Sequence, residues 1–181
     1  MVRRTAAAIV GVAVTAASLG CASPGPSVAI EQVDRQQDGT FALEIRTPRD
    51  RYTVAEAIPI VTNFVYIGPE ARTIAGGGPS LVSFGLEQIG GPVDMPRGGS
   101  DLICVQHQLT ARQAVAVPFL KSGGWSNHDP LAGFWRAYFA DKELHLPAGS
   151  WQVTASLEAI MAPDCIGQEH RVDATVAFVV E

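Results

Sequence analysis

The sequence of 181 residues is 47% hydrophobic and has 13 Lys and Arg against 18 Asp and Glu, which gives a formal net charge of −5. An acidic chain lacks the basic surface with which proteins bind nucleic acid or anionic lipid headgroups, so we expect neither as an electrostatic partner. The length suits a single domain that follows a short N-terminal signal.

Residues 1–20 have the pattern of a bacterial export signal. Arg3 and Arg4 precede an apolar stretch at residues 6–19, and Ser18-Leu19-Gly20-Cys21 resembles a lipobox. The stretch is shorter than the roughly 20 apolar residues that a membrane-spanning helix needs. We therefore predict a lipoprotein with a lipid such as palmitate on Cys21, held at the extracytoplasmic face of the cell membrane or envelope. The usual lipobox has Leu where Ser18 stands, and simple secretion is the alternative.

The chain contains three cysteines, and an odd number in an exported protein needs an explanation. Acylation of Cys21 would remove one from the count. Cys104 and Cys165 remain, in a compartment where disulfides persist, and we predict a structural disulfide between them. Closing a loop of about 60 residues would stabilise the fold by roughly 4 kcal/mol in the chain-entropy model.

Residues 21–39 are polar and contain Pro24, Gly25, Pro26 and Gly39. This composition predicts a flexible tether rather than a packed element. It would separate the lipid anchor from one domain at residues 40–181.

That domain is predicted to be all-β, because apolar residues alternate with polar ones between turn signals. The runs that lean toward strand are 41–45, 58–66, 71–75, 82–86, 102–107, 114–120, 153–157 and 172–180. Short connections favour antiparallel pairing, and Pro118 indicates a sheet edge because it cannot donate a hydrogen bond to a neighbour. We predict a sandwich of about seven strands, and the sequence leaves the strand order between residues 90 and 130 open.

One short helix is predicted near residues 130–140. Asp129 followed by Pro130 is typical of a helix N-terminus, with Asp as the cap. The next apolar residues keep a spacing of i, i+3, i+4 and i+7, and they are Leu131, Phe134, Trp135 and Tyr138. This spacing predicts that one apolar face of the helix carries much of the aromatic content of the chain.

Two segments resemble bacterial immunoglobulin-like domains. Residues 146–155, LPAGSWQVTA, are similar to the turn and strand pattern L-P-x-G-x-aromatic-x-V. Residues 51–60, RYTVAEAIPI, resemble the opening Y-x-x-G-E-x-I-x-V, including that of a proteinase-inhibitor-like subgroup, with Ala55 in place of Gly. The resemblance implies an immunoglobulin-like antiparallel β-sandwich, although Cys104 and Cys165 do not follow the antibody disulfide layout. Such a likeness in fold implies no activity.

Catalytic and metal-binding motifs are missing from the sequence. The four histidines, His107, His128, His145 and His170, lack the spacing of zinc ligands, and neither a nucleophile elbow nor a phosphate loop occurs. We therefore predict a protein with no cofactor, no metal and no catalytic residue. A zinc site assembled only by folding is the alternative.

The segment from Gly123 to Pro130 and the aromatic residues after it form the strongest candidate for recognition. The residues predicted to take part are Trp125, Asn127, His128, Trp135 and Tyr138. A Trp among polar loop residues can stack on a sugar or anchor a protein partner, whereas the alternative is that these aromatics only cover an open end of the sandwich. We expect a non-catalytic binding or structural module for an extracellular protein or glycan. A proteinase-inhibitor-like or enzyme-accessory lipoprotein is the alternative function.

Overall fold

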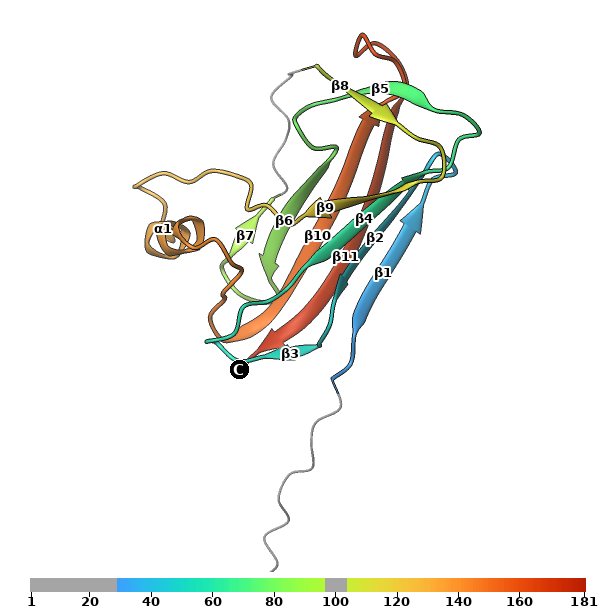
Figure 1. Cartoon of the computed structure of the whole chain (residues 1–181). Helices are drawn as coiled ribbons and strands as arrows, with labels where there is room; N and C mark the ends of the chain where they lie inside the picture. Colours follow the sequence, from blue (N-terminus) through green and yellow to red (C-terminus); the bar gives the residue numbers. More distant parts are fainter. Residues whose placement is uncertain (1–28, 97–103) are drawn as a thin grey trace, which may run out of the picture.

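The computed structural model describes residues 29–96 and 104–181. The predicted signal peptide, Cys21 and the first part of the predicted tether lie outside these residues. The described residues form a mostly β structure with two sheets packed face to face and one short helix at the side (Figure 1). The prediction of an all-β sandwich is confirmed.

The strands are β1 Gln32–Gln37, β2 Phe41–Thr47, β3 Arg51–Tyr52, β4 Val61–Tyr66, β5 Arg72–Gly76, β6 Val82–Gln88, β7 Asp94–Met95, β8 Val105–Leu109, β9 Ala114–Pro118, β10 Gly149–Ile160 and β11 Glu169–Val180, and the helix α1 is Ala132–Ala140. One sheet has the order β1-β2-β4-β9. The other has the order β3-β11-β10-β5-β8, and β6 also pairs with β10 and carries β7 on its far side. All pairs are antiparallel except β3 with β11, which is parallel.

The hairpin of β10 and β11 forms the centre of the larger sheet. Its two strands pair over twelve positions, from Gly149 opposite Val180 to Ile160 opposite Glu169. Alternate side chains of both strands are buried, as the period of two predicts. They pack with the buried side of β2, where Phe41, Leu43 and Ile45 are almost completely inaccessible. This contact closes the core between the two sheets.

Each of the eight predicted runs contributes to a strand, and Pro118 ends β9 at the edge of the smaller sheet, as expected. The number of strands is a correction, since the described residues form eleven instead of about seven. The additional strands β1, β3 and β7 are polar or only two residues long, so they show no period of two in the sequence.

The predicted tether also needs correction, because β1 occupies Gln32–Gln37 within residues 21–39. This strand pairs with β2 along its whole length. The Asp34 carboxylate accepts a hydrogen bond of 2.8 Å from the backbone N–H of Thr175 in the other sheet. Pairing with the next strand and a contact with distant β11 therefore hold a segment whose own composition is typical of a linker.

The helix lies where the sequence predicts it but begins two residues later than Pro130. The side chain of Asp129 does not cap it. Its Oδ1 atom accepts a hydrogen bond of 2.7 Å from the N–H of Leu131 in the preceding turn, and Leu131 occupies the cap position without a side-chain hydrogen bond. Trp135 and Tyr138 are buried and Phe134 packs against the core, so the predicted apolar face is confirmed.

Both segments that resemble immunoglobulin-like domains form buried corners. Trp151 is fully buried, and its Nε1–H donates a hydrogen bond of 2.9 Å to the carbonyl of Pro147. Tyr52 is also buried, with its hydroxyl hydrogen-bonded to Thr47 Oγ1 and to the backbone N–H of Arg49. These two aromatic residues fix the turns that lead into the sheets.

The predicted disulfide between Cys104 and Cys165 is present. It joins the start of β8 to the loop between β10 and β11. Next to it, the side-chain amide of Gln106 donates a hydrogen bond of 3.1 Å to the carbonyl of Pro163 in the same loop. Across residues 29–96 and 104–181, none of the helices has the length and apolar character needed to cross a bilayer.

Candidate functional site

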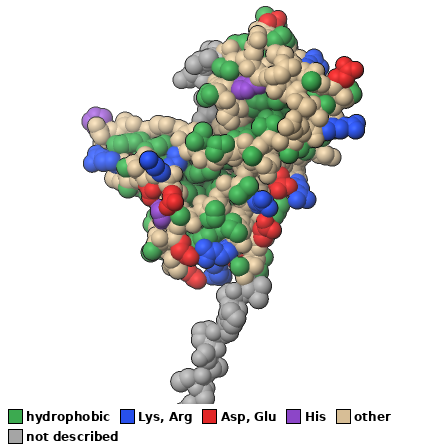
Figure 2. Space-filling view, viewed as in Figure 1, with side chains coloured by type: hydrophobic (Ala, Val, Ile, Leu, Met, Phe, Trp, Pro, Cys, Tyr) green, Lys and Arg blue, Asp and Glu red, His purple; other side chains and the backbone are tan. Residues whose placement is uncertain are grey.

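Residues 119–148 leave the sheets between β9 and β10 and carry α1 on a loop that projects to one side of the sandwich (Figure 1). We call this segment the α1 excursion. It contains all five residues predicted for recognition. Figure 2 shows hydrophobic side chains along the projecting part with Lys and Arg side chains beside them.

Aromatic packing fixes the base of the α1 excursion on the sandwich. The ring of Phe134 stacks on that of Trp151 in β10, with 6.1 Å between centroids and 13° between planes. Trp135 and Tyr138 meet edge to face at 5.8 Å, and both side chains are about 5% exposed or less. Trp135 and Tyr138 therefore belong to the core, and a ligand could not reach them without displacing the helix.

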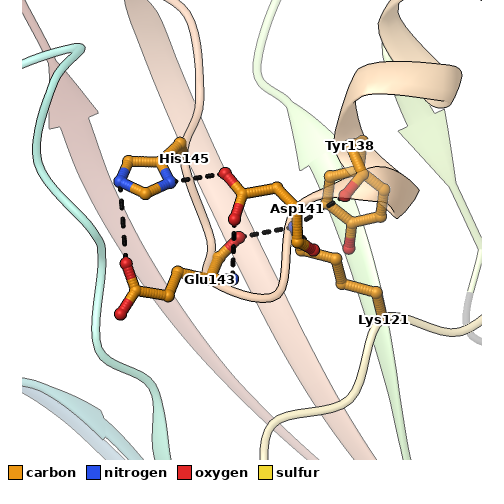
Figure 3. A network of polar contacts seen from close by, with 5 residues as sticks. All are labelled: Lys121, Tyr138, Asp141, Glu143 and His145. Atoms are coloured by element: carbon orange, nitrogen blue, oxygen red, sulfur yellow. Dashed lines mark hydrogen bonds and ion pairs between the residues drawn. The ribbon is translucent and has the colours of Figure 1, made fainter.

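The side chain of Lys121 holds the C-terminal end of α1 (Figure 3). Its ammonium group donates hydrogen bonds to three backbone carbonyls, those of Tyr138 at 2.7 Å, Asp141 at 2.9 Å and Glu143 at 2.5 Å. The last carbonyls of a helix have no partners within the helix and carry its negative dipole end, so a cation stabilises them. The ammonium also lies 4.5 Å from the centre of the Tyr138 ring.

Partial burial sets the electrostatics of this network. Desolvation lowers the pKa of Lys121, although the nearby Asp141 carboxylate opposes the shift. Desolvation also raises the pKa of the Tyr138 hydroxyl, which keeps it neutral. The pKa of Asp141 is lowered, first by the backbone N–H of Glu143 and then by the hydrogen bond with His145.

His145 stands between two carboxylates on the same side of the network. Its Nδ1 atom lies 2.7 Å from Asp141 Oδ2, and its Nε2 atom lies 4.0 Å from Glu143 Oε2. Both ring nitrogens therefore face acceptors of this chain (Figure 3). The arrangement suits a structural contact between the end of α1 and the approach to β10 better than proton exchange with a ligand.

The tip of the α1 excursion contains the other three predicted residues. Trp125 is half-buried against the core, and the guanidinium carbon of Arg136 lies 5.6 Å from the centre of its ring. Asn127 and His128 are exposed beside it. The chain enters the tip through Gly123, whose φ of +112° disfavours other residues and whose added Cβ would lie 2.2 Å from Met95 Sδ. A tryptophan ring backed by a cation, next to an amide and an imidazole, can stack on a sugar ring or receive a protein side chain.

The four histidines do not converge. His107 contacts the carbonyl of Gly78, His128 lies at the tip, His145 pairs with Asp141, and His170 pairs with Asp38 at the other end of the sandwich. Among the residues that the structure describes, no three or more His, Cys, Asp or Glu side chains are placed to hold a metal ion.

Sequence reasoning missed Lys121, Arg136 and Asp141. Lys121 bonds to carbonyls 17 to 22 residues away, and no local pattern indicates such a contact. Arg136 could have been found from the helical spacing, because it lies on the face of α1 opposite the apolar stripe. Asp141 directly follows the helix, and a residue there is expected to interact with the exposed helix end.

Comparisons of this chain with models of protein families, with curated proteins and with solved structures found no match.

Proposed function

We propose that the chain is a non-catalytic binding module, tethered to the extracytoplasmic face of the membrane through Cys21, which recognises a protein or a glycan with the tip of the α1 excursion. The observation that carries the proposal is the ring of Trp125, which is only partly buried against the core and has Arg136 beside it. Loops carried by a rigid sandwich often bind partners, and a tryptophan is a frequent anchor of such contacts.

The support beneath the tip also favours binding. Lys121 fixes the end of α1 and the Phe134 ring fixes its middle, so little conformational freedom would be lost when a partner binds. Asn127 and His128 supply polar groups at the rim of the aromatic surface. Such a combination of an aromatic centre and a polar rim is common in interfaces.

A pulldown of the tagged protein from cell-envelope extract, compared with Trp125→Ala, tests this function. We expect the partner to be recovered with the unmodified protein and to be reduced at least fivefold with Trp125→Ala. Val33→Ala is the matched control, because Val33 is an apolar residue that is 45% exposed and lies outside both the excursion and residues 51–60. Equal recovery with Trp125→Ala and Val33→Ala would show that the tip does not bind the partner.

The lipid anchor has a separate test. Intact-mass analysis of the native protein should show acyl additions that are absent from the Cys21→Ser variant. An unmodified mass would mean that the protein is secreted without an anchor, and the binding proposal would then apply to a free domain.

The alternative function, a proteinase-inhibitor-like or enzyme-accessory lipoprotein, rests on residues 51–60. Their polar contacts are internal: Glu56 accepts a hydrogen bond of 2.7 Å from the N–H of Thr53 and pairs with Arg49 at 3.0 Å. We therefore rank this function second. The test is to measure substrate cleavage by a panel of extracellular proteases in the presence of micromolar amounts of this protein. If none of the proteases is slowed, inhibition is excluded.

A further inference from the structure

A polar cavity lies at the end of the sandwich away from the α1 excursion. β10 begins at the excursion and ends at this cavity, so twelve residues of strand, roughly 40 Å, separate the two regions. The cavity has a volume of about 590 Å³ and is lined by the β1–β2 turn, the end of β4, the start of β5 and the β10–β11 loop. A volume in this range is typical of sites for small molecules.

One wall holds an imidazole whose orientation is fixed. The Asp38 carboxylate accepts hydrogen bonds of 2.8 Å from the N–H groups of Thr40 and Phe41, and its other oxygen lies 2.6 Å from His170 Nδ1. Burial opposes ionisation of Asp38, but these hydrogen bonds outweigh it and lower its pKa. With Nδ1 held in this way, Nε2 is the ring nitrogen of His170 that is left to contact a ligand.

Arg72, at the start of β5, also lines the cavity and brings a guanidinium group without a carboxylate partner. Arg72 donates a hydrogen bond of 2.8 Å to the carbonyl of Met161, which fixes its side chain, and it forms no ion pair with any described residue. Five other arginines pair with a carboxylate, namely Arg35, Arg46, Arg49, Arg51 and Arg171. The remaining N–H groups of Arg72 match the geometry of a carboxylate or phosphate.

The walls are fixed before any ligand binds. The disulfide holds the β10–β11 loop through Cys165, and the N–H of Met161 donates to the carbonyl of Gln168 across the base of the same loop. The Tyr66 ring lies directly over Gly68, where an added Cβ would be 2.1 Å from the ring. A residue other than glycine at this position would therefore displace the Tyr66 ring, which lines the cavity.

We propose that this cavity, the Arg72–His170 pocket, binds a small polar molecule that carries a carboxylate or phosphate group. The oxyanion lies on the guanidinium of Arg72, and a neutral hydroxyl or amide of the same molecule contacts Nε2 of His170. Asp38 keeps the imidazole in place, and its negative charge repels a second anionic group on that wall. This site is independent of the α1 excursion and of the partner that the excursion binds.

The test is an NMR titration of the purified full-length protein with three probes: inorganic phosphate, glucuronate and glucose. Phosphate and glucuronate present the two oxyanions, and glucose is the neutral counterpart of glucuronate. We expect saturable shifts of the His170 imidazole and Arg72 Nε signals with phosphate or glucuronate and none with glucose. The probe that binds more tightly identifies the oxyanion.

Arg72→Met should weaken that binding at least tenfold, because it removes the guanidinium and keeps most of the side-chain volume. Arg51→Met is the control, since Arg51 pairs with Glu181 at the other end of the domain. If Arg72→Met does not fold, Arg72→Lys, which keeps the charge but loses the planar fork, should weaken binding by a smaller factor. The proposal is overturned if no probe gives a saturable shift up to about 10 mM, if glucose binds as well as glucuronate, or if the Arg72 variants bind like Arg51→Met.

Discussion

The two ends of this sandwich differ in how they are packed. At the α1 excursion, aromatic rings from α1 fill the space beside β10, and the few polar groups there saturate one another. At the Arg72–His170 pocket, the loops meet around an open polar cavity and are held by a disulfide and by single hydrogen bonds. The first end is therefore closely packed beneath an exposed tip, whereas the second retains an open cavity between its loops.

The largest effect should come from emptying the aromatic end. Trp151→Ala removes a fully buried ring and its hydrogen bond to Pro147, and we expect the free energy of unfolding to fall by about 3–5 kcal/mol. Urea unfolding would measure this loss. Trp125→Ala should cost much less because that ring is only partly buried, and equal losses for the two variants would mean that Trp125 contributes to the core as much as Trp151 does.

The pocket end should respond next, through its disulfide. The double variant Cys104→Ser/Cys165→Ser opens a loop of 61 residues. We expect the free energy of unfolding to fall by about 2–4 kcal/mol, as is typical for a disulfide, and the chain-entropy model gives about 4 kcal/mol for this loop length. Amide hydrogen exchange should show the greatest loss of protection in the β10–β11 loop and little local change in α1. Uniform loss of protection in both regions, beyond the change in global stability, would mean that the two ends are coupled.

Lys121→Met should have a smaller effect, confined to the α1 excursion. It leaves the carbonyls of Tyr138, Asp141 and Glu143 without their shared donor, which we expect to cost about 1–3 kcal/mol. Urea unfolding and hydrogen exchange at the end of α1 would detect it. Lys142→Met, at an exposed position in the same segment, should be nearly neutral. If Lys142→Met lost as much free energy of unfolding as Lys121→Met, the cause would be the removed positive charge and not the three hydrogen bonds.

The smallest effect concerns pH. The pKa of Asp38 is lowered from 3.8 in the folded protein, so its contribution to stability is present above the unfolded value and is lost as pH falls through the folded value. Asp38→Asn should therefore flatten the decline of thermal stability below about pH 4, because the amide oxygen can still accept the hydrogen bonds from Thr40 and Phe41. A decline as steep as that of the unmodified protein would show that Asp38 contributes nothing to acid sensitivity.

Local patterns in the sequence were sufficient for the main architecture. The alternation of apolar residues predicted β2, β10 and β11, because one face of each strand must enter the core. The inability of Pro118 to donate predicted the edge of the smaller sheet. The odd number of cysteines, with one assigned to the predicted lipid anchor, predicted the pairing of Cys104 with Cys165.

The candidate sites were only partly predictable, because they combine local patterns with contacts between distant residues. The turn residues and the tryptophan at 123–130 identified the tip of the α1 excursion, since small and polar residues around an aromatic ring are a local signal. The sequence could not show whether Trp135 and Tyr138 are buried or exposed. Helical spacing shows that two residues share a face of the helix, but it does not show what covers that face. The pocket left no signal at all, since Asp38 and His170 are 132 residues apart.

The sequence by itself determined the strands with a period of two and the apolar face of α1, whose energetics are local, and the count of cysteines predicted the disulfide. The tertiary structure alone decided that polar β1 is a strand, that Lys121 binds the carbonyls at the end of the helix, and that Arg72 and His170 line one cavity. Burial of an apolar stripe follows from neighbours along the chain, whereas a hydrogen bond between distant residues depends on where the whole fold brings their atoms.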